Sequence, residues 1–346
     1  MRSLILLAAA LAAAHHAAAA TPVGDALQRP ALMVRAPQRA VLLAAAQAGE
    51  RIVAVGERGI VALSDDRGAT WQQAPCPVSV TLTMVRFADA QHGVAVGHGG
   101  TVLTTVDSGA TWTLRLDGRR VAQLAKAAAK TPEAQKEAER LAMDGPDKPF
   151  LDVLLWDAKR MLAVGAYGLA FYTADAGQGW KPWMERLPNP KALHWYVARR
   201  AGDALLLAGE QGLLVRSDDA GQTFRALASP YKGSWFAGEI KADGGLVLAG
   251  LRGNVWRSAD GGANWSQLAS PVPATITAMA GDADGSLLLA SQAGVVLRLQ
   301  GDALVPVNPQ ALPMPAALLP LRDGALLTLG GAGVMPVAAR AKEARQ

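Results

Sequence analysis

The stretch SDDRGATW at residues 64–71 brings two carboxylates, a glycine, a hydroxyl group and a tryptophan into one short segment. Related segments end at Trp112 (TTVDSGATW), Trp180 (TADAGQGW), Phe224 (SDDAGQTF) and Trp265 (SADGGANW). Paired acids can act in catalysis or hold a metal, but one chain does not need a catalytic acid in five copies. The recurrence therefore favours a structural role within a repeated unit.

The aspartate that lies two residues before the glycine measures the length of this unit. It falls at Asp66, Asp107, Asp175, Asp219 and Asp260, with successive gaps of 41, 68, 44 and 41 residues. A second mark, GERG, GHGG, GAYG, GEQG or GLRG, precedes each copy, and SQAG from Ser291 and GGAG from Gly330 continue the series. Periods near forty with several short strands per unit are typical of β-propellers. The sequence predicts an all-β fold, a seven-bladed β-propeller.

Each position of the repeated segment has a role in building a turn. The aspartate accepts backbone N–H bonds across the turn, and the glycine takes the left-handed conformation. The aromatic residue begins the next strand and is buried between blades. We expect this structural role for Asp66, Gly68, Trp71, Asp107, Gly109, Trp112, Asp175, Gly177, Trp180, Asp219, Gly221, Phe224, Asp260, Gly262 and Trp265.

The ends of the ring need a closing element. The segment PALMVRAP at residues 30–37 precedes the first full unit, whereas the seventh unit lacks a convincing outer strand. We expect residues 30–37 to pair with the seventh blade and protect its edge. The propeller would then span residues 21–340, followed by a tail at 341–346.

One gap in the repeat is longer than the others because of residues 119–145. Ala, Lys, Gln, Glu and Leu dominate this segment, which is a helical composition. Thr131 followed by Pro132 indicates a helix N-cap with proline in the first turn. We expect two short helices inserted between blades two and three. They form either a solvated hairpin or a docking element for a partner.

The N-terminal residues 1–20 have the composition of a secretory signal peptide, with a basic residue, a short apolar run and small residues before Thr21. The run is too short for a good membrane span. We therefore expect an exported, periplasmic or otherwise extracytoplasmic protein that is monomeric and has no transmembrane segment in the mature chain. Cys76 is the only cysteine, so no intrachain disulfide is expected.

Composition and histidine spacing exclude several kinds of partner. The formal net charge is +5 and the basic residues are scattered, which does not favour nucleic acid. His92, His98 and His194 do not have the spacing of metal ligands. We expect no metal and no cofactor.

Three arginines recur at equal spacing. Arg216, Arg257 and Arg298 each lie four residues after the second glycine of their unit, at steps of 41. They should stand at one level on three adjacent blades. They either cover neighbouring carboxylates and apolar surface or form a cationic stripe for an acidic partner.

Two connections between blades are rich in aromatic residues, NPKALHWY at residues 189–196 and SPYKGSWF at 229–236. In a propeller such connections lie on the face opposite the acidic turns. Their aromatic residues either belong to the core or help to form a binding rim, which would comprise Lys191, His194, Tyr231, Lys232 and Trp235.

The repeated segment resembles the Asp-box, or BNR, repeat. Asp66, Gly68, Thr70 and Trp71 match it fully, and the later copies match it with single changes. Seven such units behind a signal peptide resemble the photosystem II assembly and stability factor family. The resemblance implies a non-enzymatic propeller that binds protein and assists the assembly or stability of a membrane protein complex from the extracytoplasmic side.

An alternative is a carbohydrate-binding or glycoside-hydrolysing propeller, because Asp-box repeats also occur in sialidases. Sialidase-like chemistry needs an arginine trio, a tyrosine nucleophile with a glutamate, and a separate acid/base aspartate. None of Tyr167, Tyr172, Tyr196 and Tyr231 lies in a matching segment, and only QRPAL around Arg29 approaches the arginine signature. An inverting glycosidase needs only two carboxylates, so that possibility stays open.

Overall fold

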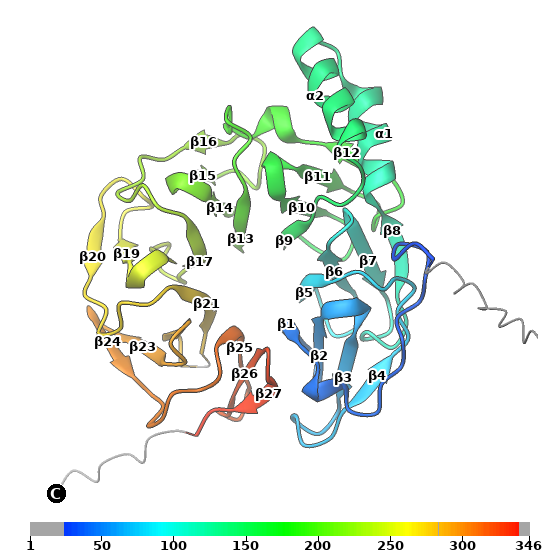
Figure 1. The fold of residues 1–346 in the computed structure, drawn as a ribbon. Coiled ribbons are helices and arrows are strands. Elements are labelled where there is room, and N and C mark those ends of the chain that lie inside the picture. The colour runs from blue at the N-terminus through cyan, green and yellow to red at the C-terminus, as the bar shows by residue number, and fades with distance from the viewer. Residues whose placement is uncertain (1–23, 283, 339–346) are drawn as a thin grey trace, which may run out of the picture.

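The computed structural model describes residues 24–282 and 284–338. The expected signal peptide at residues 1–20 and tail at 341–346 lie outside this part of the chain. Seven antiparallel sheets surround a central axis, with successive sheets side by side (Figure 1). The prediction of a seven-bladed β-propeller is confirmed.

Within each blade the strands follow one another from the axis outward. Blade one comprises β1 (Leu42–Ala48), β2 (Arg51–Gly56), β3 (Val61–Ser64) and β4 (Gln72–Ala74). Blade two comprises β5 (Leu82–Phe87), β6 (Gly93–Gly97), β7 (Thr101–Thr105) and β8 (Thr113–Leu116). Blade three comprises β9 (Phe150–Leu155), β10 (Met161–Gly165), β11 (Ala170–Thr173) and β12 (Lys181–Pro182). Blade four comprises β13 (Trp195–Ala201), β14 (Ala204–Gly209), β15 (Leu214–Ser217) and β16 (Arg225–Ala226). Blade five comprises β17 (Trp235–Ile240), β18 (Leu246–Gly250), β19 (Val255–Ser258) and β20 (Ser266–Leu268). Blade six comprises β21 (Ile276–Gly281), β22 (Leu287–Ser291), β23 (Val296–Gln300) and β24 (Ala303–Pro306). Blade seven comprises β25 (Pro315–Pro320), β26 (Leu326–Gly330) and β27 (Gly333–Pro336).

Short 3-10 turns precede β1 or lie in the connections between later strands. They are η1 (Pro37–Arg39), η2 (Glu57–Gly59), η3 (Ala166–Gly168), η4 (Met184–Arg186), η5 (Glu210–Gly212) and η6 (Leu251–Gly253). Every residue of the second strands β6, β10, β18 and β22 is buried, because neighbouring blades cover both faces of each sheet. The core therefore lies between blades.

The strand order gives the ring two different faces. The turns between second and third strands meet the connections between blades on one face, which we call the glycine-turn face. On it Gly59 and Gly212 pack against the backbone carbonyls of Val78 and Tyr231. The acidic turns lie on the opposite face, together with the turns between first and second strands, and we call it the acidic-turn face.

The paired glycines of the second mark are required for two different reasons. The second glycine takes a left-handed conformation, for example Gly59 with φ 73° and Gly168 with φ 71°. The first glycine is extended and allows a close approach. A Cβ on Gly56 would lie 2.0 Å from the carbonyl oxygen of Val41, just before the innermost strand. This close approach sets the first and second strands against each other at the glycine-turn face.

The expectation that residues 30–37 close the seventh blade is wrong. Residues 24–36, which we call the strap, run along the outside of blade one (Figure 1). The Ala31 N–H donates to the carbonyl of Cys76 at 3.0 Å, and the Val34 N–H donates to the side chain of Gln73 at 2.7 Å. The side-chain amide of Gln73 thus hydrogen-bonds to the backbone of the strap, as the backbone of a neighbouring strand would.

Apolar packing joins the ends of the ring. Leu327 and Leu329 of blade seven lie in one buried cluster with Leu42 and Ile52 of blade one. The turn η1 also lies against β27, where a Cβ on Gly333 would meet the backbone carbonyl of Gln38 at 2.0 Å. Within the described residues, the seventh sheet has three strands.

The predicted helical insertion is present between β8 and β9. It consists of α1 (Gly118–Ala128) and α2 (Pro132–Met143). Thr131 caps α2 by accepting a hydrogen bond from the Ala134 N–H at 3.2 Å, with Pro132 in the first turn. Neither helix is long and apolar enough to cross a membrane, and the same holds for the rest of residues 24–282 and 284–338. Val121 and Ala125 of α1 are buried in a cluster with Trp180, so α1 is packed onto blade three.

Candidate functional site

The five acidic turns share one hydrogen-bond pattern. In the first, Asp66 Oδ1 accepts from the Ser64 hydroxyl and the Thr70 N–H, both at 2.8 Å. The Ser64 hydroxyl in turn accepts from the Gly68 N–H at 2.8 Å, and the Trp71 indole donates to the Gly68 carbonyl at 2.9 Å. Asp107, Asp175, Asp219 and Asp260 accept from the equivalent positions of their turns.

This pattern fixes the charge state of the aspartates. Hydrogen bonds from the side chain and backbone of Thr70 lower the pKa of Asp66 to about 2, and those from Thr223 do the same for Asp219. The turn glycines are left-handed, with φ 92° at Gly68 and φ 96° at Gly262. These carboxylates are committed to turn backbone and lie at the outer rim of the acidic-turn face.

The three regularly spaced arginines occupy equivalent positions on the third strands. Arg216, Arg257 and Arg298 pair in register with Leu206, Val247 and Leu288 of the second strands. Each forms an ion pair, Arg216 with Asp218 at 2.6 Å, Arg257 with Asp302, and Arg298 with Asp282 at 2.7 Å. Their positive charges are therefore neutralised by nearby aspartates, and they do not form an unpaired cationic stripe.

The residues of the expected binding rim are only partly brought together. Trp235 is fully buried, so it cannot contact a partner directly, and Tyr231 packs edge-on against it at 5.1 Å between ring centroids. Lys191 and Lys232 are exposed. His194 Nδ1 lies 2.6 Å from Glu210 Oε2, and this contact lowers the pKa of Glu210.

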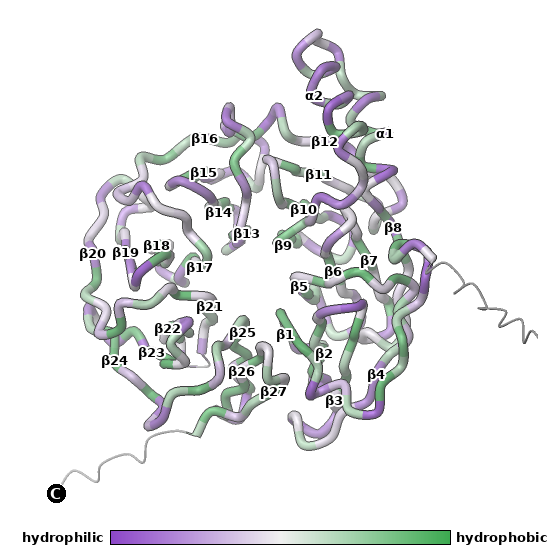
Figure 2. Tube along the Cα trace, in the orientation of Figure 1, coloured by the Kyte–Doolittle hydropathy of each residue, from purple (hydrophilic) through white to green (hydrophobic). Residues whose placement is uncertain are grey.

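A central channel of about 540 Å³ runs between the innermost strands. Its two walls differ in chemistry. Blades six, seven and one contribute small or aliphatic residues, including Ala44, Ala46, Met279, Leu318 and Leu319. Blades two, four and five contribute charged residues, and Figure 2 shows the same contrast between hydrophobic β1 and hydrophilic β13. The channel is therefore amphipathic across its width.

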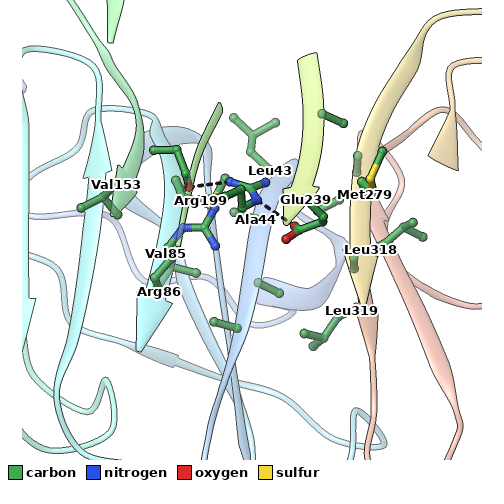
Figure 3. Close-up of a pocket in the computed structure, with 18 of the residues that line it drawn as sticks. Leu43, Ala44, Val85, Arg86, Val153, Arg199, Glu239, Met279, Leu318 and Leu319 are labelled. Carbon is green, nitrogen blue, oxygen red and sulfur yellow. Dashed lines mark hydrogen bonds and ion pairs between the residues drawn. The ribbon is translucent and has the colours of Figure 1, made fainter. Parts of the chain in front are cut away.

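The charged wall is a chain of ion pairs that links four adjacent blades. Arg86 on β5 contacts Asp152 on β9 at 2.9 Å, and Asp152 contacts Arg199 on β13 at 2.5 Å. Arg199 also contacts Glu239 on β17 at 2.7 Å. Figure 3 shows Arg199 pointing toward Glu239, with Met279 and Leu318 on the neighbouring strands.

Asp152 is the fixed centre of this chain. It is fully buried and also accepts from the backbone N–H groups of Val153 at 2.8 Å and Ala198 at 2.9 Å. Burial alone would raise its pKa, but the charges of Arg86 and Arg199 and the two N–H bonds outweigh burial and lower it. Burial likewise opposes the charge of Arg199, yet Glu239 and Asp152 raise its pKa. Asp152 and Arg199 therefore both stay charged.

Arg200 is the one arginine of the channel lining that forms no ion pair within the described residues. It donates to the Trp156 carbonyl at 3.4 Å and is exposed. Arg86 and Arg199, in contrast, are neutralised by their carboxylates. Arg200 therefore leaves an uncompensated positive charge in the channel.

Aromatic rings line the channel toward the glycine-turn face. Tyr196 and Phe236, both of which line the channel, lie 5.0 Å apart between ring centroids. Tyr196 stacks with His194 at 6.0 Å, and His194 contacts Tyr167 at 4.8 Å. These contacts carry an aromatic row from the rim of blade three to the mouth of the channel.

The sequence contained a signal for the channel residues that the repeat pattern alone did not reveal. Arg86, Arg199 and Glu239 occupy the same position of their innermost strands, four residues after Leu82, Trp195 and Trp235. Aligning those strands by the glycine marks would have shown charges where other blades have Ala or Leu.

Within residues 24–282 and 284–338, no group of three or more His, Cys, Asp or Glu side chains could hold a metal ion.

Comparison with known proteins identifies the fold. YCF48 bound to a D1 peptide superposes with a TM-score of 0.66 at 17% identity, covering 90% of this chain and 100% of that one. YCF48 from Cyanidioschyzon merolae gives 0.62 at 15% identity, covering 88% and 97%. Virginiamycin B lyase from Staphylococcus aureus gives 0.67 at 10% identity, covering 90% and 99%. No protein-family model and no curated protein sequence matches the chain. At these identities the similarity shows a shared propeller fold.

Proposed function

We propose that this protein is a non-enzymatic, protein-binding propeller that holds a segment of a membrane protein complex from the extracytoplasmic side and assists the assembly or stability of that complex. The observation that carries the proposal is the amphipathic channel with its unpaired Arg200. An extended peptide directs alternate side chains to opposite sides. Its apolar side chains can therefore face β1, β21 and β25 while an acidic group faces Arg200.

The size of the channel favours a peptide segment as the ligand. A volume of about 540 Å³ accommodates a few side chains and excludes a folded domain. Tyr196 and Phe236 offer aromatic surface at the mouth, where such rings commonly anchor protein ligands. The peptide held by the similarly folded YCF48 is further support.

The state of the carboxylates supports a binding role over glycoside hydrolysis. A glycosidase acid must stay protonated near neutral pH, which requires a raised pKa. Asp152 instead has a lowered pKa because of Arg86 and Arg199, and the turn aspartates have lowered pKa values because of their hydrogen bonds.

Co-purification from detergent-solubilised membranes of the native host tests this proposal. The tagged protein and two single variants are compared, Arg200→Gln in the channel and Arg160→Gln on the acidic-turn face. Both remove one exposed arginine charge, and Arg160 pairs only with Asp157. We expect one membrane protein subunit to be retained by the native protein and by Arg160→Gln. Because a bond to a charged group contributes about 1.5–3 kcal/mol, Arg200→Gln should retain it at least about tenfold less.

Equal retention by all three proteins would place the contact outside the channel. Release of product from chromogenic glycosides by the native protein, and loss of that release on replacing a channel carboxylate, would contradict the non-enzymatic role.

A further inference from the structure

The two faces of the ring differ in how their cations are paired. The glycine-turn face and its connections carry exposed cations that form no ion pair within the described residues: Arg39, Arg58, Lys191, Lys232 and Arg252. Most cations on the acidic-turn face are paired with carboxylates, as in Arg51–Asp65, Arg67–Asp323, Arg160–Asp157, Lys241–Asp243 and Arg322–Glu50. Lys159 and Lys181 are exposed toward that face and form no ion pair within the described residues. The glycine-turn face therefore carries more unneutralised positive charge than the acidic-turn face.

The turns of this face hold several side chains at one height. Arg58, Tyr167, Gln211 and Arg252 each occupy the third position of the same turn and have φ between 53° and 57°. Blade two has Gly99 at this position, with φ 67°. Because equivalent turns of a ring lie at equivalent heights, these side chains form a level rim around the channel mouth. A left-handed conformation is strained for residues with a side chain, so it persists only because the turn imposes it. The turn therefore holds these four side chains exposed on the glycine-turn face.

Exposed apolar side chains stand on the same face. Tyr167 is 51% exposed, Leu251 is 38% exposed and Met314 is 57% exposed. The turns SQAG of blade six and GGAG of blade seven carry no charged residue. Glu57, Asp147 and Glu185 are the exposed carboxylates of this face that form no ion pair within the described residues, and they are fewer than its unpaired cations.

We propose that the glycine-turn face docks flat on an anionic lipid surface. Arg58, Lys232 and Arg252 would contact the headgroups, while Tyr167 and Leu251 would enter the boundary between headgroups and acyl chains. These side chains lie at one height and are spread around the ring, which suits a flat membrane surface better than the uneven surface of a protein. The carboxylate-rich opposite face would be repelled, which fixes the orientation of the ring. The channel mouth then faces the bilayer.

Co-sedimentation with protein-free vesicles tests this docking. We expect the purified protein to bind vesicles of phosphatidylcholine with phosphatidylglycerol, and not vesicles of phosphatidylcholine alone. Binding should weaken in about 0.5 M salt because the charges are exposed. The variant Arg58→Gly with Arg252→Gly should bind about 25-fold more weakly, since each cation near such a surface contributes about fivefold. Glycine suits both positions, as Gly99 shows, so the fold is retained.

The opposite face offers a matched control. Arg67 is also left-handed, with φ 61°, and Arg322 is exposed; both are ion-paired. The variant Arg67→Gly with Arg322→Ser therefore makes the same change in net charge and should bind anionic vesicles within about twofold of the native protein. Absence of vesicle binding, or an equal loss in both double variants, would overturn the proposal.

The vesicle assay separates this inference from the channel proposal. Because the vesicles contain no protein, Arg200→Gln should bind them normally. If the native protein ignores anionic vesicles while Arg58→Gly with Arg252→Gly loses the co-purified subunit, the face is a protein-binding surface and the lipid proposal is wrong.

Discussion

The aromatic residue that ends each acidic turn connects a turn to the core between blades. The Trp112 indole donates to the Gly109 carbonyl at 2.9 Å, and its ring lies edge-on to Phe87 at 6.4 Å between centroids. Trp112 is 7% exposed, whereas Trp71 in the equivalent position of blade one is only partly buried. The same residue type at the same position of the repeat therefore contributes unequally.

Replacing Trp112 by alanine should lower the free energy of unfolding by about 3–5 kcal/mol, as expected for truncating a buried aromatic residue. Trp71→Ala should cost clearly less because Trp71 buries less area. Urea denaturation of both variants measures the difference. A loss below about 1 kcal/mol for Trp112→Ala would show that this ring is not part of the core.

The turn aspartates should make stability depend on acidic pH. Their pKa is about 2 in the folded protein at Asp66, Asp219 and Asp260, below the value of an unfolded aspartate near 3.9. The unfolded state binds protons first, so stability is full above about pH 4 and falls as pH drops toward 2. Asp219→Asn keeps an acceptor oxygen but does not titrate. The thermal midpoint of Asp219→Asn should therefore fall less steeply between pH 4 and pH 2 than that of the native protein. Parallel curves would contradict this.

At the scale of elements, the strap stabilises blades one and two and leaves the seventh untouched. Leu27 and Ala31 are buried, and the Ser79 N–H donates to the Ala26 carbonyl at 2.8 Å. Burying a leucine contributes about 1.5–3 kcal/mol. Deleting residues 24–35 should therefore lower the free energy of unfolding by at least about 2 kcal/mol.

Hydrogen exchange locates that effect. Backbone amides of β4 and of residues 76–79 should exchange faster after the deletion, while those of β25, β26 and β27 stay unchanged. Faster exchange in blade seven would show that the strap stabilises that blade and closes the ring.

The helical hairpin has a buried half and a solvent-exposed half. Val121 and Ala125 of α1 are buried against the cluster that contains Trp180, whereas α2 buries only Ala138. Replacing residues 119–145 by a short Gly/Ser linker should lower the free energy of unfolding by about 2–3 kcal/mol, since it exposes this apolar area. Lys136→Ala on the exposed side of α2 should change it by less than about 0.5 kcal/mol. A linker variant as stable as the native protein would show that the hairpin only decorates the ring.

At the scale of the whole molecule, the repeat made the number of blades predictable. The glycine marks and turn aspartates carry the period because each is required by backbone geometry, as the 2.0 Å approach at Gly56 shows. The position of the strap was not predictable in this way. It depends on hydrogen bonds between the side chain of Gln73 and the strap backbone, and a polar residue on an outer strand gives no sign of such a contact.

The candidate site was less accessible to sequence than the fold. Arg86, Asp152, Arg199 and Glu239 lie on four different innermost strands, and only the closed ring brings them into one chain of ion pairs. The regular spacing of Arg216, Arg257 and Arg298 predicted that they occupy equivalent positions on three adjacent blades. It could not reveal that each meets an aspartate nearby.

Site-specific photo-crosslinking in the native host tests the central claim most directly, that a segment of a membrane protein occupies the channel. A photoreactive phenylalanine analogue replaces Phe236 at the channel mouth, and in a control protein it replaces Phe224 in the acidic turn of blade four. We expect position 236 to form an adduct with one membrane protein subunit and position 224 to form none. We also expect Arg200→Gln to reduce the adduct at position 236. Adducts of equal yield at both positions, or none with a membrane protein from position 236, would show that no membrane protein segment occupies the channel.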